Sequence, residues 1–294
     1  MSRKLVEFTG NRVILMACST CNINCSHCYI GYKGDYSVDK LREMALHFKG
    51  QGKLVRIDGA EILTNPEYLQ VYKEIGQNWV MTNGLALFNN RNMIDKLVEY
   101  EITDVYLSYH FGVTKELNAM STEKLNSVIA ELRKVNRNVI LMVTITRSNI
   151  NNIKAMCDHA YKLGATGIEF NKIFLQGRAI GRTDLLPTEE ELNQFFKDLC
   201  EVRNKYDIKQ FVVRRSGTFG KDRYLEKNNF KCSCGVRKVT ITSDGKVYGC
   251  TCMSKPGFEV GELIDGKIFI YEDFKNDRTW CMADKCGVLG INHF

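Results

Sequence analysis

The chain of 294 residues has little proline, little tryptophan and no long apolar run. It contains only three prolines and no low-complexity tract, so nothing in it predicts a disordered linker. No stretch of about 18 apolar residues occurs, which argues against a membrane-spanning helix. The first residues also lack the apolar segment of a secretory signal peptide. We therefore expect a cytoplasmic protein without membrane contact.

The excess of positive over negative charge in the chain is also modest. The formal net charge is +7, and lysines and arginines alternate with acidic residues through the predicted helices. This alternation is typical of solvated helix faces, so the sequence does not predict nucleic-acid binding. An acidic peptide or a phosphorylated substrate would be favoured only weakly by this charge.

Cysteine, by contrast, is abundant. Of the twelve cysteines, four lie within residues 18–28 and six within residues 232–286. Disulfides are disfavoured in a reducing cytosol, so clustered cysteines there indicate metal binding. Cys157 and Cys200 stand apart in predicted helices, where we expect small buried hydrophobic side chains.

Short apolar runs alternate with longer amphipathic segments from residue 12 to about residue 207. Strands are predicted at residues 12–16, 53–57, 79–82, 104–108, 139–145 and 167–173. Helices are predicted at residues 38–48, 66–76, 91–100, 122–135, 150–163 and 188–206. Six β–α units in series predict an α/β fold with a parallel sheet. Because six units are too few for a closed eight-unit barrel, we expect a partial, open (β/α)6 barrel with its chemistry at the C-terminal strand ends.

The pattern changes beyond residue 207. Residues 209–215 predict one further strand, and residues 239–248 predict a hairpin with Asp244 and Gly245 at its turn. Cysteines flank this hairpin on both sides. We therefore predict two domains, the partial barrel at residues 1–207 and a small cysteine-rich α+β extension at residues 208–294.

Cys21, Cys25 and Cys28 lie in one short polar segment close behind the first predicted strand. Iron–sulfur clusters usually take four cysteines, so three thiolates leave one iron of a cube-shaped cluster available to a small molecule. A zinc site normally uses paired ligands or a histidine at tetrahedral spacing, which this spacing fits poorly. The segment therefore predicts an iron–sulfur site with one open corner.

Two further motifs end later strands. Gly59, Ala60 and Glu61 follow the second predicted strand, where small residues let a ligand approach the backbone and a carboxylate can accept from an ammonium group. Thr82 and Asn83 end the third strand. Asp-Gly is an ordinary turn, so each motif alone is a weak signal. Their order along successive strands is far more specific.

Together these motifs resemble those of the radical S-adenosylmethionine (SAM) superfamily over the first two thirds of the chain. The resemblance implies that Cys21, Cys25 and Cys28 bind a [4Fe–4S] cluster whose open iron binds SAM. Glu61 would hold the amine of SAM, with Ala60 in place of the second glycine of the family motif. The residues expected to contact SAM are His27, Gly59, Ala60, Glu61, Thr82, Asn83, Ser108 and Arg178.

Three of these residues also allow a plainer interpretation. His27 occupies the place where the superfamily usually has an aromatic residue near the adenine, but a surface imidazole is the alternative. Ser108 ends the fourth predicted strand, where a hydroxyl commonly contacts the ribose or the methionyl carboxylate, although a lone serine is usually a loop residue. Arg178 lies in a Gly-Arg-Ala stretch found in one branch of the family, and it pairs a carboxylate or is simply solvated.

The cysteine spacing after residue 230 resembles the twitch or SPASM extension of that branch, which carries auxiliary iron–sulfur clusters. Cys234, Gly245 and Cys250 match its opening. Cys281 and Cys286 would complete a site of four thiolates.

The extension departs from the full SPASM pattern. The chain ends at Phe294 with four residues between its last two cysteines, which favours a twitch-like domain with one auxiliary [4Fe–4S] cluster. Cys232 and Cys252 are spare or alternative ligands. Zinc is the alternative for this site.

The resemblance also implies a reaction. An external one-electron reductant of the flavodoxin or ferredoxin kind would reduce the cluster, SAM would be cleaved to a 5′-deoxyadenosyl radical, and this radical would abstract a substrate hydrogen. We expect an oxidoreductase that matures a ribosomally made peptide by crosslinking, epimerisation or oxidation. Because the first predicted strand begins at residue 12, leader recognition would need a separate leader-binding protein or the barrel itself.

Two other functions stay open. A small-molecule dehydrogenase acting on a sugar or an alcohol is the alternative, with the auxiliary cluster taking the second electron. An electron-carrying or zinc-structured module is the third, although the open three-thiolate site argues against it. No catalytic acid or base follows firmly from the sequence: His110, Glu169 and Cys252 are pocket candidates, and the first two are equally consistent with packed structural residues.

Overall fold

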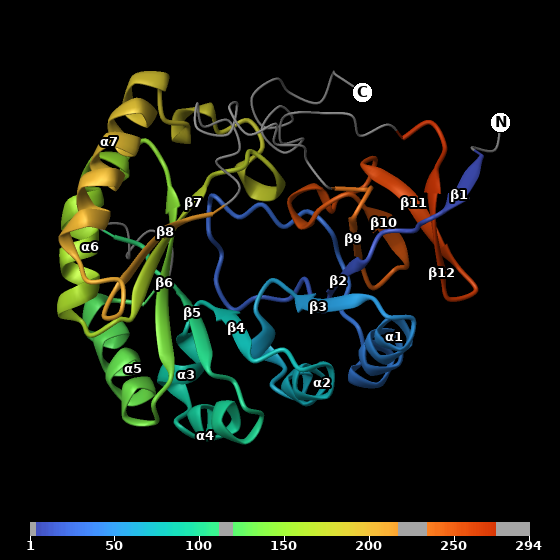
Figure 1. The fold of residues 1–294 in the computed structure, drawn as a ribbon, viewed down its shortest axis with the longest axis horizontal. Helices are drawn as coiled ribbons and strands as arrows, with labels where there is room; N and C mark the ends of the chain where they lie inside the picture. Colours follow the sequence, from blue (N-terminus) through green and yellow to red (C-terminus); the bar gives the residue numbers. More distant parts are fainter. Residues whose placement is uncertain (1–3, 112–119, 217–233, 275–294) are drawn as a thin grey trace.

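The structure is a computed structural model that describes residues 4–111, 120–216 and 234–274. Within these residues the strands form two sheets (Figure 1). The first sheet has the order β1 (Leu5–Glu7), β12 (Lys267–Tyr271), β11 (Glu259–Ile264), β10 (Lys246–Tyr248), β9 (Lys238–Ile241), β2 (Arg12–Met16) and β3 (Leu54–Asp58). The second has the order β4 (Trp79–Thr82), β5 (Asp104–Ser108), β6 (Asn138–Ile145), β7 (Gly167–Lys172) and β8 (Val212–Arg215).

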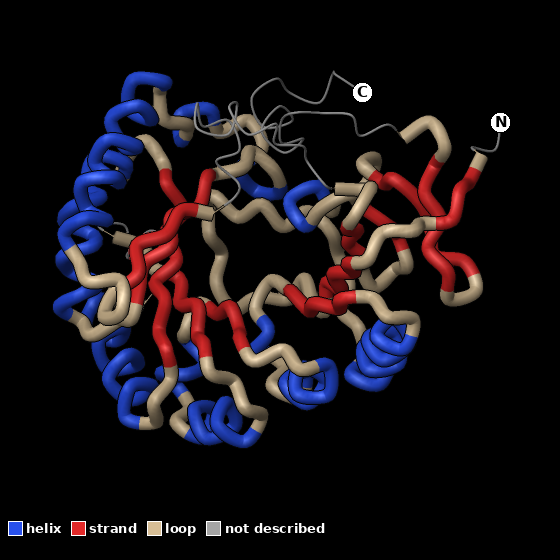
Figure 2. The backbone as a smooth tube through the Cα atoms, viewed as in Figure 1, coloured by secondary structure: helices blue, strands red, loops and turns tan. Residues whose placement is uncertain are grey.

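Helices cover the outer side of strands β2 to β8 (Figure 2). They are α1 (Val38–Gly50), α2 (Tyr68–Ile75), α3 (Leu85–Asn89), α4 (Asn92–Glu99), α5 (Thr122–Lys134), α6 (Ile153–Lys162) and α7 (Glu189–Lys205). Their starts follow from local sequence. Ser37 caps α1, and Thr188 forms a capping box with Glu191 at the start of α7, which satisfies backbone N–H groups that have no partner within the helix.

The prediction of an α/β fold built on parallel strands is confirmed. β3 runs parallel to β2, and β4 to β8 are parallel throughout. Every strand predicted in the first 180 residues lies within one residue of an observed strand. Among the described strands, no pairing joins β3 to β4, so the barrel is not closed.

The C-terminal strands continue the first sheet. β9 runs parallel to β2, and β10, β11, β12 and β1 follow in antiparallel order. The hairpin predicted at residues 239–248 is present as β9 and β10. The strand predicted at 209–215 is the shorter β8, which pairs with β7. The proposed boundary at residue 207 stays a prediction.

Sequence periodicity does not reveal β1, β11, β12 or α3. β1 has three residues and is largely exposed, so it carries no apolar run. Its edge hydrogen bonds go to β12, at the other end of the described chain. This strand forms because a distant partner supplies the backbone groups, which a local pattern cannot show.

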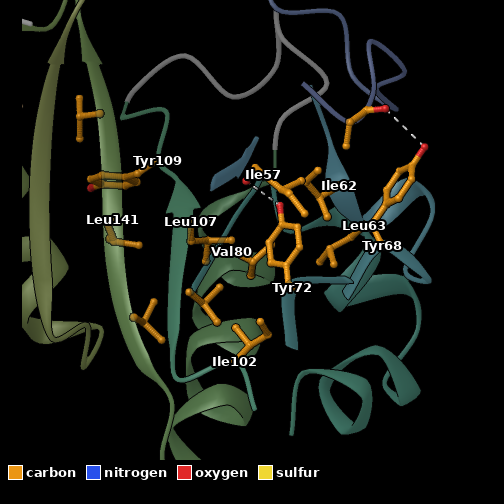
Figure 3. Packing of buried hydrophobic residues seen from close by; sticks show 14 of the residues in the cluster. Ile57, Ile62, Leu63, Tyr68, Tyr72, Val80, Ile102, Leu107, Tyr109 and Leu141 are labelled. Carbon is orange, nitrogen blue, oxygen red and sulfur yellow. Dashed lines mark hydrogen bonds between the residues drawn. The ribbon is translucent and has the colours of Figure 1, made fainter. Parts of the chain in front are cut away.

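The main core lies between the strands and their outer helices (Figure 3). Alternate strand residues face it. Val55 and Ile57 of β3 pack against this core, and the Tyr72 hydroxyl of α2 donates to the Ile57 carbonyl (3.1 Å). Arg56 and Asp58 therefore lie on the opposite face of β3, away from the helices.

One expectation about the isolated cysteines is wrong. Cys157 is buried in the core as expected, but Cys200 is exposed. α7 buries Phe195, Leu199 and Val202, and Cys200 follows Leu199 by one residue, which turns it toward solvent.

In the part of the chain that the structure describes, no helix has the length and apolar character needed to cross a bilayer.

Candidate functional site

The cysteine loop, residues 17–36, leaves the carboxyl end of β2 and is joined to the loop after β3 by backbone hydrogen bonds. The Ala60 N–H donates to the Cys18 carbonyl (2.8 Å). The Glu61 N–H donates to the Thr20 carbonyl (3.2 Å). The first two sequence motifs are therefore held side by side at the same end of the sheet.

Glu61 is the most enclosed acid of this site, with 1% of its surface exposed. Its carboxylate accepts from the Thr82 hydroxyl (2.7 Å), the Asn83 N–H (2.6 Å) and the Leu63 N–H (3.2 Å). Burial raises the pKa of Glu61, and these hydrogen bonds oppose that rise. A carboxylate can accept about four hydrogen bonds, so one acceptor position is left beyond these three.

Asn83 connects this network to the cysteine loop. Its side-chain amide donates to Oδ1 of the Asn22 side chain (2.7 Å) and approaches the Cys21 sulfur (3.8 Å). The end of β4 therefore touches the cysteine loop directly, although about 60 residues separate the two in sequence.

The segment after β7 also contacts the cysteine loop, at Cys25 to Ile30. The Arg178 N–H donates to the Cys28 carbonyl (2.9 Å), and Arg178 Nε donates to the Cys25 carbonyl (3.0 Å). Gly177 has φ +57°, and a Cβ there would lie 2.5 Å from the Ile30 carbonyl oxygen. Arg178 is thus a clamp on the backbone of the loop, and only glycine allows so close an approach.

The three cysteine thiols lie half-buried on this loop. Burial, together with repulsion from the other two thiols, raises the pKa of Cys25 to about 11, and burial raises the pKa of Cys21. No group of three metal-binding side chains converges on a single ion within the described residues. The three thiolates of a cluster bind different iron atoms and need not converge in that way, and an all-sulfur donor set suits iron–sulfur. The residues present therefore fit a cluster.

His27 belongs to the cysteine loop, and its ring centroid lies 5.4 Å from that of His110, with the two ring planes tilted by 49°. His110 Nε2 is buried and has no hydrogen-bond partner in the described structure. Burial lowers the pKa of His27, and the charge of Arg178 lowers it further. The structure thus brings together one residue expected near the adenine and one candidate pocket residue.

We expect His110 to make the ligand-free protein less stable in acid. Burial, with a smaller contribution from His27, lowers the His110 pKa from its usual 6.5 to about 4. Because the unfolded state then binds more protons between these values, stability present at pH 7 is lost as the pH falls. The loss reaches up to about 2 kcal/mol by pH 5.

Urea unfolding at pH 7 and pH 5 measures this loss. In His110→Gln the difference between the two pH values should shrink by a similar amount. An unchanged difference in that variant would show that His110 does not titrate in this way.

The close contact of Gly59 with Cys18 gives a second prediction. A Cβ at Gly59 would lie 2.8 Å from both the Cys18 sulfur and Ile62 Cδ1. Gly59→Ala should therefore destabilise the protein by about 1–3 kcal/mol, as overpacking does in cores. Gly50→Ala is the matched control, because a Cβ there has nothing within 4 Å.

A double-mutant cycle in thermal unfolding locates the cause. In a Cys18→Ala background the sulfur is gone, so Gly59→Ala should cost at least about 1 kcal/mol less. An equal cost in both backgrounds would assign the effect to Ile62 or to the backbone.

Among the candidates from the C-terminal part, Cys234 and Cys250 are buried in one apolar cluster with Phe174. Cys252 and Tyr29 pack against it. Tyr29 immediately follows Cys28, so this cluster adjoins the cysteine loop. The remaining cysteines of this part, Cys232, Cys281 and Cys286, lie outside the described residues.

Two further candidates occupy strand positions. Ser108 is half-buried at the carboxyl end of β5. Glu169 is half-buried on β7, directly opposite Arg214 of β8. Burial raises the pKa of Glu169, while Arg214 and Arg56 oppose the rise.

Three residues that build the site are not singled out by the sequence: Asn22, Tyr29 and Gly177. Each acts through a partner distant in the chain, so no local pattern marks Asn22 or Tyr29. Gly177 had a signal, since it precedes Arg178 in the Gly-Arg-Ala stretch, but glycine is also an ordinary loop residue.

No protein-family model matches the chain. Among curated proteins, PqqA peptide cyclase of Granulibacter bethesdensis is 23% identical over 258 residues. The match covers 83% of this chain and 61% of that protein. The chain therefore spans about three fifths of the length of this relative.

Solved structures are similar over most of the chain. SuiB of Streptococcus suis, bound to its precursor peptide SuiA, has a TM-score of 0.65 at 13% identity, covering 86% of this chain and 62% of SuiB. SuiB bound to SAM has a TM-score of 0.66 at 14% identity, covering 83% of this chain and 60% of SuiB. The protein anSMEcpe, solved with bound AdoMet (another name for SAM), has a TM-score of 0.64 at 16% identity. The match covers 85% of this chain and 77% of anSMEcpe. The chain has the fold of these SAM-binding proteins.

Proposed function

We propose that this chain is a radical SAM enzyme that modifies a peptide. The observation that carries the proposal is the convergence of the cysteine loop, the Glu61 network and the Arg178 clamp at the carboxyl ends of β2, β3, β4 and β7. In parallel α/β folds this is where ligands bind. The fold is shared with proteins solved with bound SAM.

Each part of the site has a role in this proposal. Cys21, Cys25 and Cys28 would hold a [4Fe–4S] cluster with one open iron for SAM. When bound, the cluster supplies one electron to SAM, and cleavage gives a 5′-deoxyadenosyl radical. Glu61 has one remaining acceptor position for the amine of SAM. Thr82 and Asn83 hold the Glu61 carboxylate in place for that contact.

The remaining SAM contacts are proposed from position. His27 in the cysteine loop and His110 beside it would offer imidazole rings to the adenine side of SAM. Gly59 and Ala60 would contact the ligand through their backbone, since the space on the Cβ side of Gly59 is taken by Cys18 and Ile62. Ser108 offers a hydroxyl at the end of β5. Arg178 acts by fixing the loop through its contacts with the Cys25 and Cys28 carbonyls.

Three relatives support a peptide substrate. The curated relative is named PqqA peptide cyclase. SuiB was solved with its precursor peptide SuiA, and anSMEcpe with a peptide named Cp18Cys. We propose a peptide as the substrate of this chain, an external one-electron reductant such as a flavodoxin or ferredoxin, and a separate protein that binds the leader.

The C-terminal cysteines are proposed to hold an auxiliary [4Fe–4S] cluster, which makes residues 208–294 a twitch-like extension. Cys234 and Cys250 are buried together, and Cys281 and Cys286 would supply the other thiolates. Cys252 adjoins this group and would donate a hydrogen atom in an epimerisation. Glu169 is the proposed acid or base, because it is a half-buried carboxyl on a strand whose end carries the site.

Anaerobic reconstitution tests this function. We expect about eight iron and eight sulfide per chain, and cleavage of SAM by dithionite-reduced protein. A content of about four iron and four sulfide per chain, together with bound zinc, would indicate a zinc site in place of the auxiliary cluster. Colourless, iron-free protein would contradict the proposal. Coexpression with short peptides encoded beside the gene, followed by mass spectrometry, then identifies the change made to the peptide.

A further inference from the structure

Arg56 is a charged residue on the inner face of β3 that the proposed site does not use. It alternates with Val55 and Ile57, which pack against the helix-covered core. The ion pair with Asp58 leaves 41% of the Arg56 side chain exposed but only 5% of the Asp58 side chain. The arginine is thus the accessible member of the pair.

Two contacts fix the orientation of the guanidinium. Its Nε donates to Asp58 Oδ1 (2.7 Å), and its Cζ lies 4.5 Å from the centroid of the Trp79 ring. Stacking on an aromatic ring and a short ion pair both restrict the rotamers of the arginine. A ligand that binds Arg56 therefore meets a preorganised group.

The two terminal nitrogens of Arg56 are left to other ligands. An arginine has five N–H donors, and only the Nε donor has a partner within the described structure. Neither terminal nitrogen is fully buried, and 41% of the side chain is exposed, so a ligand can reach both nitrogens. This planar pair of donors matches the two oxygens of a carboxylate.

Aromatic and charged side chains continue from Arg56 across the inner strand faces. The Trp79 and Tyr106 rings are 6.0 Å apart, edge to face. Arg214 Nη1 donates to the Tyr106 hydroxyl (3.4 Å). Glu169 lies directly opposite Arg214 across β7 and β8, and the charges of Arg214 and Arg56 both oppose the rise of the Glu169 pKa. The inner face therefore carries two arginines beside an aromatic pair.

We propose that Arg56 binds a carboxylate of the peptide through its two terminal nitrogens, and so selects substrates with an acidic side chain or a free C-terminus near the modified residue. This inference rests on the proposed function. A purely structural Arg56 would need one donor for Asp58, which a lysine also provides. A fork fixed by Asp58 and Trp79, with its outer donors free, provides the geometry for recognising a second carboxylate.

Binding of small model ligands to the reconstituted, SAM-loaded protein tests the inference by anaerobic calorimetry. N-acetyl-L-glutamate α-methylamide presents a side-chain carboxylate, N-acetyl-L-alanine presents a C-terminal one, and N-acetyl-L-glutamine α-methylamide is neutral. We expect one of the two carboxylates to bind at least about 10-fold more tightly than the neutral ligand. The ligand that binds more tightly shows whether Arg56 recognises a side-chain or a C-terminal carboxylate.

Arg56→Lys keeps the positive charge but loses the planar pair of terminal donors. It should therefore weaken binding of the preferred carboxylate ligand about 10-fold and leave binding of the neutral ligand unchanged. Arg42→Lys, an arginine paired with Glu74 on the outer helices, is the matched control and should bind as wild type. Equal affinity of wild type for all three ligands would overturn the inference, and this comparison needs no variant that folds. Carboxylate binding unchanged in Arg56→Lys would also overturn it.

SAM binding and peptide-independent SAM cleavage separate this inference from the proposed function. Both should be as wild type in Arg56→Lys. A parallel loss of SAM binding would assign Arg56 to the carboxylate of SAM and overturn the inference while leaving the function intact. Wild-type protein that never cleaves SAM would contradict the function instead, and the ligand comparison still decides the carboxylate site.

Discussion

Replacing Cys21, Cys25 and Cys28 together by alanine should abolish SAM cleavage by the reduced protein. In the proposed function these three thiols hold the cluster, so SAM would have no iron to bind without them. We expect the activity to fall more than about 1,000-fold, equivalent to about 4 kcal/mol in barrier height. The iron content should fall by about four atoms per chain.

The loss should be specific to the cofactor. The three thiols are only half-buried, so we expect unfolding of the apo variant to differ from wild type by less than about 1 kcal/mol per site. Cys200→Ala is the control, since Cys200 is exposed on α7, outside the site. Cleavage of SAM that persists in the triple variant would contradict the radical mechanism. An equal loss in Cys200→Ala would indicate general damage.

Gly177→Ala should impair the site with little effect elsewhere in the fold. A Cβ at Gly177 would lie 2.5 Å from the Ile30 carbonyl oxygen, 2.6 Å from the Cys28 carbonyl oxygen and 2.7 Å from the Tyr29 carbonyl carbon. These are backbone atoms, so the cysteine loop must shift as a unit. A displacement of about 1 Å at a reacting centre can cost about 100-fold in rate, and we expect a fall of that size in SAM cleavage.

Gly181→Ala separates the clash from the backbone conformation. Gly181 has φ +77°, in the same left-handed region, but a Cβ there has nothing within 4 Å. It should cost about 1 kcal/mol of stability and leave SAM cleavage near wild type. Cluster absorbance, iron content and the rate of SAM cleavage, measured on both variants, distinguish the effect of the clash from that of the backbone conformation. Similar losses in both would show that the left-handed backbone, not contact with the cysteine loop, is responsible.

The strands and motifs of the first 180 residues were accessible from the sequence because their signals are local. Apolar runs such as that of β2 mark a buried strand without reference to partners. Cys21, Cys25 and Cys28 lie within eight residues, so their common loop follows from spacing. The parallel arrangement then predicts that Glu61 and Thr82, at the ends of successive strands, lie at one edge of the sheet.

The contacts within the site were less accessible. Arg178 was expected to pair a carboxylate or to be solvated, yet it binds the backbone carbonyls of Cys25 and Cys28. Cys18 lies outside the motif, but its sulfur fills the space beside Gly59. Burial raises the pKa of Cys18 to about 12, so this thiol stays protonated at neutral pH. These contacts join segments between about 40 and 150 residues apart, where sequence spacing carries no information.

The sequence by itself determined the order of strands β2 to β7 and of the longer helices between them, the parallel α/β class and the sulfur-rich loop, because each depends on the side chains of one short segment. Only the tertiary structure decided that β9 to β12 and β1 extend the sheet of β2, that Glu61 is held by Thr82 and Asn83, and that Arg56 pairs with Asp58 through Nε. Such contacts depend on which distant groups supply hydrogen-bond partners. That choice is made when the whole chain packs, because most buried donors and acceptors must find a partner in the same arrangement.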